Sequence, residues 1–468
     1  MKKLKILYLL SLLISNTAFS TTLSESLVSA YQNNPELIAA REQLKMQDEQ
    51  IFEAIAGFLP QIGYEAIKRY SKTDTASSTT AQQEGNTTKY VTQTTKTAPW
   101  THSKSKQSSL NIQQNIFKGG QSLMAIQIAK YNIESGRAQL LSTEQKIFVQ
   151  TIQAYLSVIQ TKEVIEVNKQ NVKFYEQKYE SVVQEVEAGI KKRSDLATAK
   201  ASKSNAQTLL AKATGEYDTA LATYNKVVGI PADNLTEDKF LSSLPANQLE
   251  FLQKSLKDNP DLLNVLYQQK SADIAVLSNA AIMLPTVNIG GTLDRSWAKT
   301  TGLSTTTNPP TSNSKTVYVS VNVPIYQGGM EYSGIRKANA QAASLKYYVK
   351  NAKATVTQNT TQAWSAYIVN QESVKTANEA VNAAQIAVDG TQEEYREGVN
   401  TLSNLITAQE NLYHYQLSLI NAEQELELSK YNIISIMGRL NAKDLALPTK
   451  IYSVTKNYNK IKMKLIGL

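Results

Sequence analysis

The sequence predicts an α+β chain in which a unit of long helices and one β-hairpin occurs twice. Three observations predict this fold class. Short motifs recur in the same order in both halves, proline is missing from two very long segments, and two regions alternate apolar and polar residues with a period of two. The 468 residues include only 19 glycines and 11 prolines, which suits long helices better than a loop-rich enzyme.

The chain begins with a targeting segment. Three lysines in the first five residues precede a short apolar run at 6–14, and Ala18-Phe19-Ser20 has the small-residue pattern of a cleavage site. The run is well short of the ~20 residues that a membrane-spanning helix needs. We therefore expect residues 1–20 to be a secretory signal peptide. No later stretch approaches a spanning helix, so we expect the exported chain to be either soluble or inserted as a β-barrel.

The chain contains no cysteine and has a formal net charge of +9. An exported protein without cysteine forms no disulfides and carries no lipid on an N-terminal cysteine, so packing and association must stabilise it. Five lysines lie in a basic C-terminal tail, 446–468. We interpret this tail as solvated, because export argues against a nucleic-acid partner.

An internal repeat organises the chain. The sequence Asn-Pro-Glu-Leu at 34–37 recurs as Asn-Pro-Asp-Leu at 259–262, an offset of 225 residues. Ile-Phe-Lys-Gly-Gly at 116–120 recurs as Ile-Tyr-Gln-Gly-Gly at 325–329, and the offset of 209 then persists. The first copy is therefore longer by 16 residues between Pro60 and Ile116, where we expect an exposed loop. We place the first repeat at 21–235 and the second at 236–445.

Long helices follow each expected hairpin. No proline lies between Pro99 and Pro231 or between Pro324 and Pro448. A helix over 122–187 would be roughly 100 Å long, which indicates a coiled coil or tube. After a break at Gly398 in the second copy, two rows of residues recur every seven positions: Leu405, Leu412, Leu419, Leu426 and Ile433, with Ala408, Tyr415, Ala422, Ser429 and Ile436 beside them. These rows predict a left-handed coiled-coil seam, with the core stripe of a soluble helical bundle as the alternative.

The hairpins, at about 61–117 and about 286–326, show the alternation. From Val317 to Ile325 every second residue is aliphatic, and the residues between are Tyr, Ser, Asn and Pro. This pattern suits a barrel wall with lipid outside and water inside, and an ordinary hairpin on a helical core is the alternative. Four strands cannot enclose water, because the smallest membrane barrels have ~8 strands. If the strands form a barrel, several chains must pool them, and a trimer that supplies twelve is a simple solution. Trp100 and Trp297 are candidate interfacial anchors, although loop packing explains Trp100 equally well.

In this order, the motifs resemble the TolC family of outer-membrane efflux proteins. The matching features are the signal peptide, the tandem repeat, Asn-Pro-Glu-Leu, Leu-Pro before and Gly-Gly after each hairpin, and the break Gly-x-x-x-x-Ser-Asp/Asn-Leu. The resemblance covers residues 23–445. It implies a trimeric 12-stranded outer-membrane β-barrel, with four strands per chain, and a long α-helical coiled-coil barrel that extends into the periplasm of a Gram-negative cell. It also implies an exit duct for multidrug efflux or type I protein secretion.

The resemblance further implies partners and sites. The chain would form a homotrimer with two further copies of itself and would contact outer-membrane lipid. Its other partners would be a periplasmic adaptor (membrane fusion) protein and an inner-membrane pump or ABC exporter. The helix breaks would form the periplasmic tip, where adaptors dock on Gly189, Ile190, Lys191, Gly398, Val399 and Asn400. The gate at the entrance would involve Asp195 and Tyr395. Family members can carry two aspartates at the positions of Asn404 and Thr407, so we do not expect a strongly cation-selective acidic ring here.

An enzyme and a coiled-coil structural protein fit the sequence less well. The only histidines are His102, in the expected polar loop, and His414, in the Leu-heptad helix. With no cysteine, no phosphate-binding loop and no metal-ligand cluster in the sequence, we expect neither an enzyme nor a cofactor. An exported trimeric coiled-coil structural protein or adhesin would share the helices and the export. That alternative does not explain two repeated hairpins with amphipathic strands.

Overall fold

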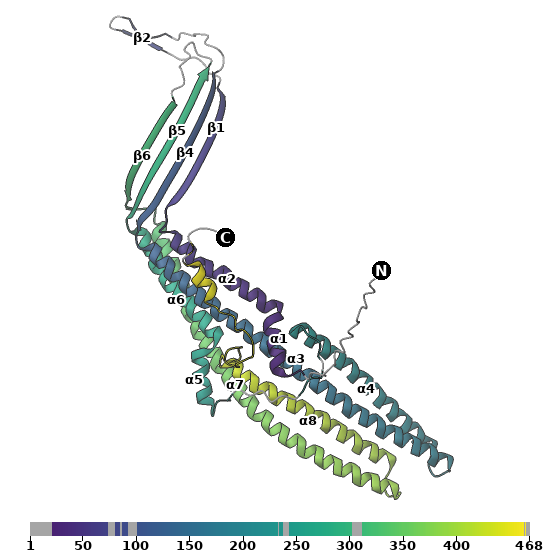
Figure 1. The fold of residues 1–468 in the computed structure, drawn as a ribbon. Helices are drawn as coiled ribbons and strands as arrows, with labels where there is room; N and C mark the ends of the chain where they lie inside the picture. Colours follow the sequence, from purple (N-terminus) through teal and green to yellow (C-terminus); the bar gives the residue numbers. More distant parts are fainter. Residues whose placement is uncertain are drawn as a thin grey trace, which may run out of the picture. The chain divides into compact units, whose positions relative to one another are not determined.

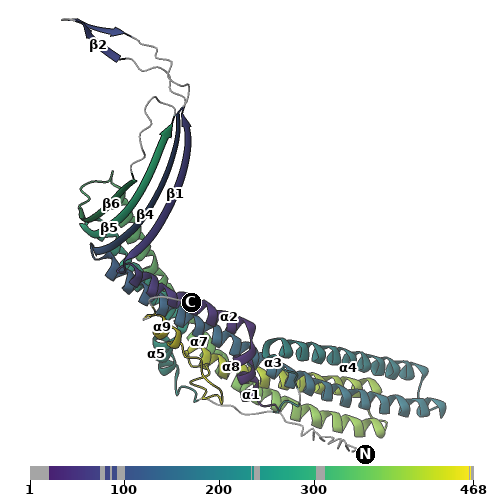
Figure 2. The same ribbon diagram turned by 45° about the horizontal axis from the view of Figure 1, so that its top comes forward.

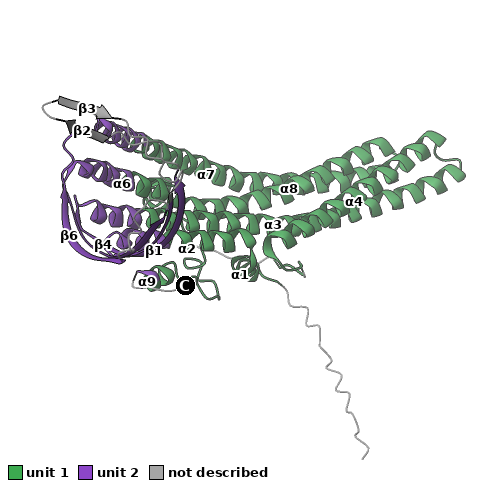
Figure 3. Ribbon diagram, turned by 90° about the horizontal axis from the view of Figure 1, so that it is seen from above, with its two compact units in different colours: residues 1–48, 132–269, 345–460 green, residues 49–131, 270–344, 461–468 purple. Residues whose placement is uncertain are grey.

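The computed structural model describes residues 21–73, 80–84, 87–91, 101–232, 234–236, 243–301, 311–462 and 464. The expected signal peptide and Trp100 lie outside these residues. The chain divides into two compact units (Figure 3). Unit 1 comprises 1–48, 132–269 and 345–460, and unit 2 comprises 49–131, 270–344 and 461–468. Each unit therefore combines segments from both sequence repeats.

The two repeats contain matching elements in the same order (Figure 1). The first has α1 (Leu23–Asn33), α2 (Pro35–Ala56), β1 (Gln61–Thr73), β4 (Thr101–Lys118), α3 (Gln121–Glu187) and α4 (Arg193–Val228). The second has α5 (Gln248–Asp258), α6 (Pro260–Ala280), the 3₁₀ turn η1 (Ala281–Met283), β5 (Thr286–Thr301), β6 (Thr311–Asn322), α7 (Met330–Arg396) and α8 (Leu402–Ile436). Helices α3 and α7 both have 67 residues. A short helix, α9 (Lys456–Ile461), follows the repeats.

The recurring Asn-Pro motif begins a helix in each copy. The Asn34 side-chain oxygen accepts the backbone N–H groups of Glu36 and Leu37, and its amide donates to the Val227 carbonyl at 3.0 Å. In the second copy, Asn259 accepts from Asp261 and Leu262 and donates to the Ile436 carbonyl at 3.1 Å. Proline at the first helical position lacks only an N–H that would stay unpaired there. The asparagine therefore caps one helix and also satisfies a carbonyl near the end of another.

A four-stranded antiparallel sheet in unit 2 has the order β1-β4-β5-β6, and its strands lie side by side in Figures 1 and 2. Each repeat contributes one hairpin to it. The additional residues of the first copy contain a separate two-stranded hairpin, β2 (Thr80–Glu84) with β3 (Thr87–Val91). The insertion thus lies between the ends of β1 and β4, as the change of offset predicts.

The pairing register places the side chains on two faces, because successive residues of a strand point to opposite sides. One face, which we call the aliphatic face, carries the row Ile62, Ile112, Gly291 and Val317. The opposite, polar face carries the row Gly63, Asn111, Thr292 and Thr316. The aliphatic side chains are open to solvent in the single chain: Val317, Val319 and Val321 are 82%, 65% and 63% exposed.

Three details of the sheet correct the sequence-based expectations. A β-bulge between Asn115 and Phe117 shifts the register between β4 and β5, so Phe117 lies opposite Val287 and the expected period of two is interrupted at Ile116. Strand β6 ends at Asn322, before the expected end of the hairpin, because Pro324 has no N–H for the ladder. His102 lies in β4, not in a loop, and its ring stacks on Tyr70 with centroids 5.7 Å apart.

The main core of unit 1 joins both repeats. Its largest fully buried side chains include Phe148, Tyr155, Tyr224 and Phe251. Helix α4 buries an alanine every seven residues, at Ala199, Ala206, Ala213 and Ala220. Small residues at this spacing let a neighbouring helix approach closely, as in a coiled-coil seam. None of the described helices combines the length and the apolar composition that crossing a bilayer requires.

The C-terminal segment corrects the expectation of a solvated tail. Leu447 is buried in the core of unit 1, the Tyr452 N–H donates to the Tyr31 hydroxyl at 2.9 Å, and Arg41 lies 5.4 Å from the Tyr452 ring. The lysines at 450, 456 and 460 are nevertheless exposed. Leu447 and Tyr452 of the tail therefore pack on unit 1, whereas these three lysines remain in water.

Candidate functional site

The turns that join α3 to α4 and α7 to α8 have the same backbone geometry. Gly189 and Gly398 take positive φ values of 75° and 77°. Ile190 N–H donates to the Glu185 carbonyl at 2.8 Å, and Val399 N–H donates to the Glu394 carbonyl at 2.9 Å. The Gly189 N–H donates to the backbone carbonyl of Val186, and the Gly398 N–H donates to that of Tyr395. This is a Schellman turn in both copies, and its left-handed position favours glycine.

The residue after each turn glycine has an unusual environment. In a Schellman turn it commonly packs on an apolar residue in the last turn of the helix. Here the facing positions are Glu185 and Glu394, and Ile190 and Val399 are 71% and 77% exposed. Each turn therefore exposes a branched aliphatic side chain to solvent. Neither side chain packs on an apolar residue of the preceding helical turn.

The helices that leave the turns are capped differently. The Asp195 carboxylate accepts the Lys192 N–H at 3.2 Å, in the first turn of α4. At the matching position of α8, the Asn404 N–H donates to the Thr401 hydroxyl at 3.3 Å. The Asn400 amide donates to Glu394 at 2.9 Å, and its oxygen accepts from the Asn404 side chain. The carboxylate cap of the first copy is thus replaced in the second by a hydroxyl cap, beside asparagine amides that bind the Glu394 carboxylate.

Tyr395 links α7 to α3 beside these turns. Its hydroxyl donates to the Glu185 carboxylate at 3.0 Å, and the same carboxylate accepts from the Ser181 hydroxyl at 2.8 Å. The Lys191 ammonium lies 4.7 Å from the centroid of the Tyr395 ring. The ring is buried in a cluster with Tyr175, Val182, Ala199, Ala206, Leu402, Leu405 and Ile406. All four long helices of unit 1 meet in this cluster.

Electrostatics keep Tyr395 in its protonated, donating form. Burial raises the pKa of Tyr395, and the hydrogen bond and charge of Glu185, with the charge of Asp195, raise it further. Burial lowers the pKa of Lys178, whose ammonium lies 5.6 Å from the same ring. Because the hydroxyl holds its proton well above neutral pH, the Tyr395–Glu185 hydrogen bond persists across the physiological range.

The structure brings together only part of the sequence-predicted set. Tyr395 donates to Glu185 and not to Asp195, although Asp195 is near enough to affect its pKa. Asn404 and Thr407 are both exposed and lie three residues apart in α8, so they share one face of that helix. The Thr407 hydroxyl donates to the Ser403 carbonyl at 3.0 Å. Among the described residues no cluster of acidic or histidine side chains is arranged to hold a metal ion.

Sequence reasoning missed two features of this region. Glu185 was not singled out, although the 209-residue offset matches it with Glu394, next to Tyr395. A buried polar layer between α3 and α8 was also missed. Tyr413 donates to Asn168 at 3.1 Å, and Gln409 donates to Asn171 at 3.3 Å. Polar residues within an apolar seam fix the register of a helix pair.

Comparisons with known proteins agree with this architecture. The sequence model of the family described as outer membrane efflux protein matches residues 27–229 and 251–439, one segment in each repeat. Outer membrane efflux protein BepC of Brucella suis is 28% identical over 460 residues, 98% of this chain and 94% of BepC. Outer membrane protein TolC of Escherichia coli is 24% identical over 449 residues, 92% of this chain and 86% of TolC.

A solved structure shares the fold across the chain. The Campylobacter jejuni CmeC outer membrane channel has a TM-score of 0.73 and 15% sequence identity, over 94% of this chain and 89% of CmeC. The likeness covers the long helices and the four antiparallel strands. This chain belongs to the outer membrane efflux protein family and is an outer-membrane channel, not an enzyme.

Proposed function

We propose that three copies of this chain form an exit duct through the outer membrane of a Gram-negative cell. Each copy contributes its four strands to a twelve-stranded barrel, and the helices extend into the periplasm. The duct receives substrate from an inner-membrane pump or ABC exporter through a periplasmic adaptor protein, in multidrug efflux or type I protein secretion. Residues 1–20 direct export and are removed.

The four-stranded sheet carries this proposal. Its aliphatic face is exposed in the single chain, with Val317 at 82%. Its outer strands, β1 and β6, each have one side without a strand partner among the described residues. Open edges and an uncovered aliphatic face are unfavourable in water. Closing three sheets into one barrel removes the edges, and lipid covers the aliphatic face.

The two turns support the assignment of the adaptor-docking site to Gly189, Ile190, Lys191, Gly398, Val399 and Asn400. Their common geometry repeats within one chain, so a trimer would present six similar turns. Exposed Ile190 and Val399 supply apolar contact, and Lys191 and Asn400 supply polar contact. Such a small apolar centre with a polar rim suits a protein interface.

Purified mature chain in planar bilayers tests the proposal. We expect single-channel conductance steps and a particle with the mass of three chains by light scattering corrected for detergent. An exported coiled-coil rod or adhesin, the alternative, would also be trimeric but would produce no steps. A monomer without conductance would refute the duct.

The gate assignment makes a separate prediction. The Asp195→Ala change removes the carboxylate that accepts the Lys192 N–H, which costs about 1 kcal/mol of helix-start stability. We expect the first turn of α4 to fray, the closed tip to loosen and the single-channel conductance to rise. The Asp218→Ala change, at an exposed position of the same helix, removes the same charge away from the turn and should leave conductance unchanged. Equal conductance of Asp195→Ala and wild type would count against Asp195 in the gate.

A further inference from the structure

The aliphatic face of the sheet has a second zone that is basic. The register places seven cations on this face: Lys68, Lys72, Lys104, Lys106, Arg295, Lys299 and Lys315. They lie toward the ends of the strands at Thr73, Thr101, Thr301 and Thr311, which is the end away from the helical connections of unit 2. Both acidic residues of the four strands, Glu65 and Asp294, lie on the polar face. The charged residues of the aliphatic face are therefore all positive, whereas the polar face carries both signs, with Arg69 and Lys118 as its cations.

Several cations of this zone lie directly opposite each other on neighbouring strands. Lys68 is the direct cross-strand partner of Lys106, and Lys104 is the direct partner of Lys299. Like charges in directly opposed positions destabilise a sheet. Lys68, Lys104, Lys106, Arg295, Lys299 and Lys315 form no ion pair with any carboxylate in the part of the chain that the structure describes. An anion bound between them would remove this repulsion.

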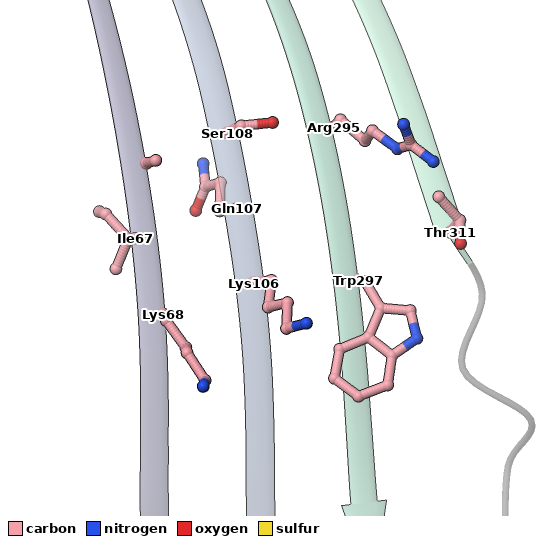
Figure 4. Close-up of a pocket in the computed structure, with 9 residues that line it drawn as sticks. Ile67, Lys68, Lys106, Gln107, Ser108, Arg295, Trp297 and Thr311 are labelled. Atoms are coloured by element: carbon pink, nitrogen blue, oxygen red, sulfur yellow. The ribbon is translucent and has the colours of Figure 1, made fainter.

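Aromatic rings lie among the cations. Trp297 is the cross-strand partner of Lys106, whose ammonium lies 5.8 Å from the indole ring. The Lys104 ammonium lies 5.7 Å from the ring of Tyr70. A surface hollow of about 500 Å³ is lined by Lys68, Lys106, Arg295, Trp297 and Thr311. Figure 4 shows these side chains on neighbouring strands.

The zone directly follows the aliphatic residues on the same face. Lys106 is four residues from Leu110, about 13 Å along the strand. Lysine, arginine, tyrosine and tryptophan collect at the level of lipid headgroups, because their stems and rings are apolar and their tips are polar. A row of cations at that level matches the phosphate groups of anionic lipid.

We propose that this zone binds the phosphate groups of an anionic lipid in the outer leaflet of the membrane. The inference rests on the proposed function, because it requires the aliphatic face to contact lipid. Lys68 and Lys106 hold the phosphate between β1 and β4, Arg295 extends the site to β5, and the Trp297 ring packs against the apolar part of the lipid. The bound lipid neutralises the opposed lysines and so stabilises the sheet near its outer end.

The test is lipid binding by the assembled mature protein in an uncharged detergent, followed by native mass spectrometry. The probes are a glycolipid with two phosphates, the same lipid after dephosphorylation, and inorganic phosphate. We expect wild-type protein to retain only the phosphorylated lipid. The double change Lys68→Gln/Lys106→Gln should weaken binding about 30-fold, since each surface cation contributes about fivefold. The charge-conserving change Lys68→Arg/Lys106→Arg should restore it.

A matched control exists in the same two strands. The double change Arg69→Gln/Lys118→Gln also removes two positive charges from β1 and β4, but from the polar face. We expect its lipid affinity to stay within about twofold of wild type. Equal weakening by the two double changes would overturn the proposal, and so would competition by millimolar inorganic phosphate.

Two further readouts keep the outcomes distinct. If Lys68→Gln/Lys106→Gln does not assemble, the single changes Lys68→Gln and Lys106→Gln replace it, each with an expected loss of about fivefold. Planar-bilayer conductance is measured for every variant. Absence of conductance in wild-type protein would refute the duct itself, whereas normal conductance without preference for phosphorylated lipid would refute only the lipid site.

Discussion

Replacing Gly438 with alanine should lower the free energy of unfolding by about 3–5 kcal/mol. The alanine would have to adopt a left-handed backbone conformation, and its Cβ atom would overlap with a neighbouring backbone. Gly438 has a φ of 79°. A Cβ atom there would lie 2.1 Å from the Asp258 carbonyl oxygen and 2.8 Å from its carbon. These are backbone atoms at the end of α5, so no rotation of a side chain relieves the overlap. Moving them would also displace Asn259, which caps α6 and donates to Ile436.

The matched control is the equivalent glycine of the first repeat. Gly229 has a φ of 82°, but a Cβ there would meet only the Asn33 Cβ at 3.5 Å, an ordinary contact. Gly229→Ala should therefore lower the free energy of unfolding by only about 1–2 kcal/mol, which is the cost of placing alanine in a left-handed conformation. Urea unfolding of the two purified variants, followed by circular dichroism, measures the difference. Equal losses would show that close approach to Asp258 does not determine the requirement for glycine.

The Val319→Arg change should strongly impair insertion into lipid, at a cost of about 2–4 kcal/mol per chain. Val319 lies between Val317 and Val321 on the aliphatic face and is 65% exposed in the single chain. If lipid covers this face, the guanidinium must leave water within the apolar band. Because three copies carry the change, the effect on the trimer should be severe. Folding yield in phosphatidylcholine vesicles measures it.

The adjacent Ser320→Arg change is the control. Ser320 lies opposite Asn288 on the polar face, so its arginine would point into water in a closed barrel. We expect a folding yield near that of wild type, with altered ion selectivity. If Ser320→Arg impaired insertion and Val319→Arg did not, the two faces of the sheet would be assigned the wrong way round.

The sequence by itself determined the repeat, the type and order of the main elements, and the family. These follow from local rules that act within a few residues. The absence of proline permits α3 and α7 to run without interruption, and Gly189 and Gly398 end them because the left-handed position favours glycine. Period-two alternation revealed β6 and its aliphatic face, and the change of offset revealed the insertion that contains β2 and β3. The motifs on the turns also predicted Gly189, Gly398 and Asp195 as candidate site residues, through the family resemblance.

Only the tertiary structure decided which distant side chains meet. The Tyr395–Glu185 hydrogen bond joins residues 210 positions apart, and no local pattern selects Glu185 among the other acidic residues of α3. The same holds for the Asn168–Tyr413 pair and for the opposed lysines Lys68 and Lys106, which depend on the register between strands. The bulge at Ile116, by contrast, shifts the register between β4 and β5 by one residue. Partners distant in sequence are chosen by packing and register, which sum over many contacts, whereas helix ends and strand faces are set by the backbone preferences of a few neighbouring residues.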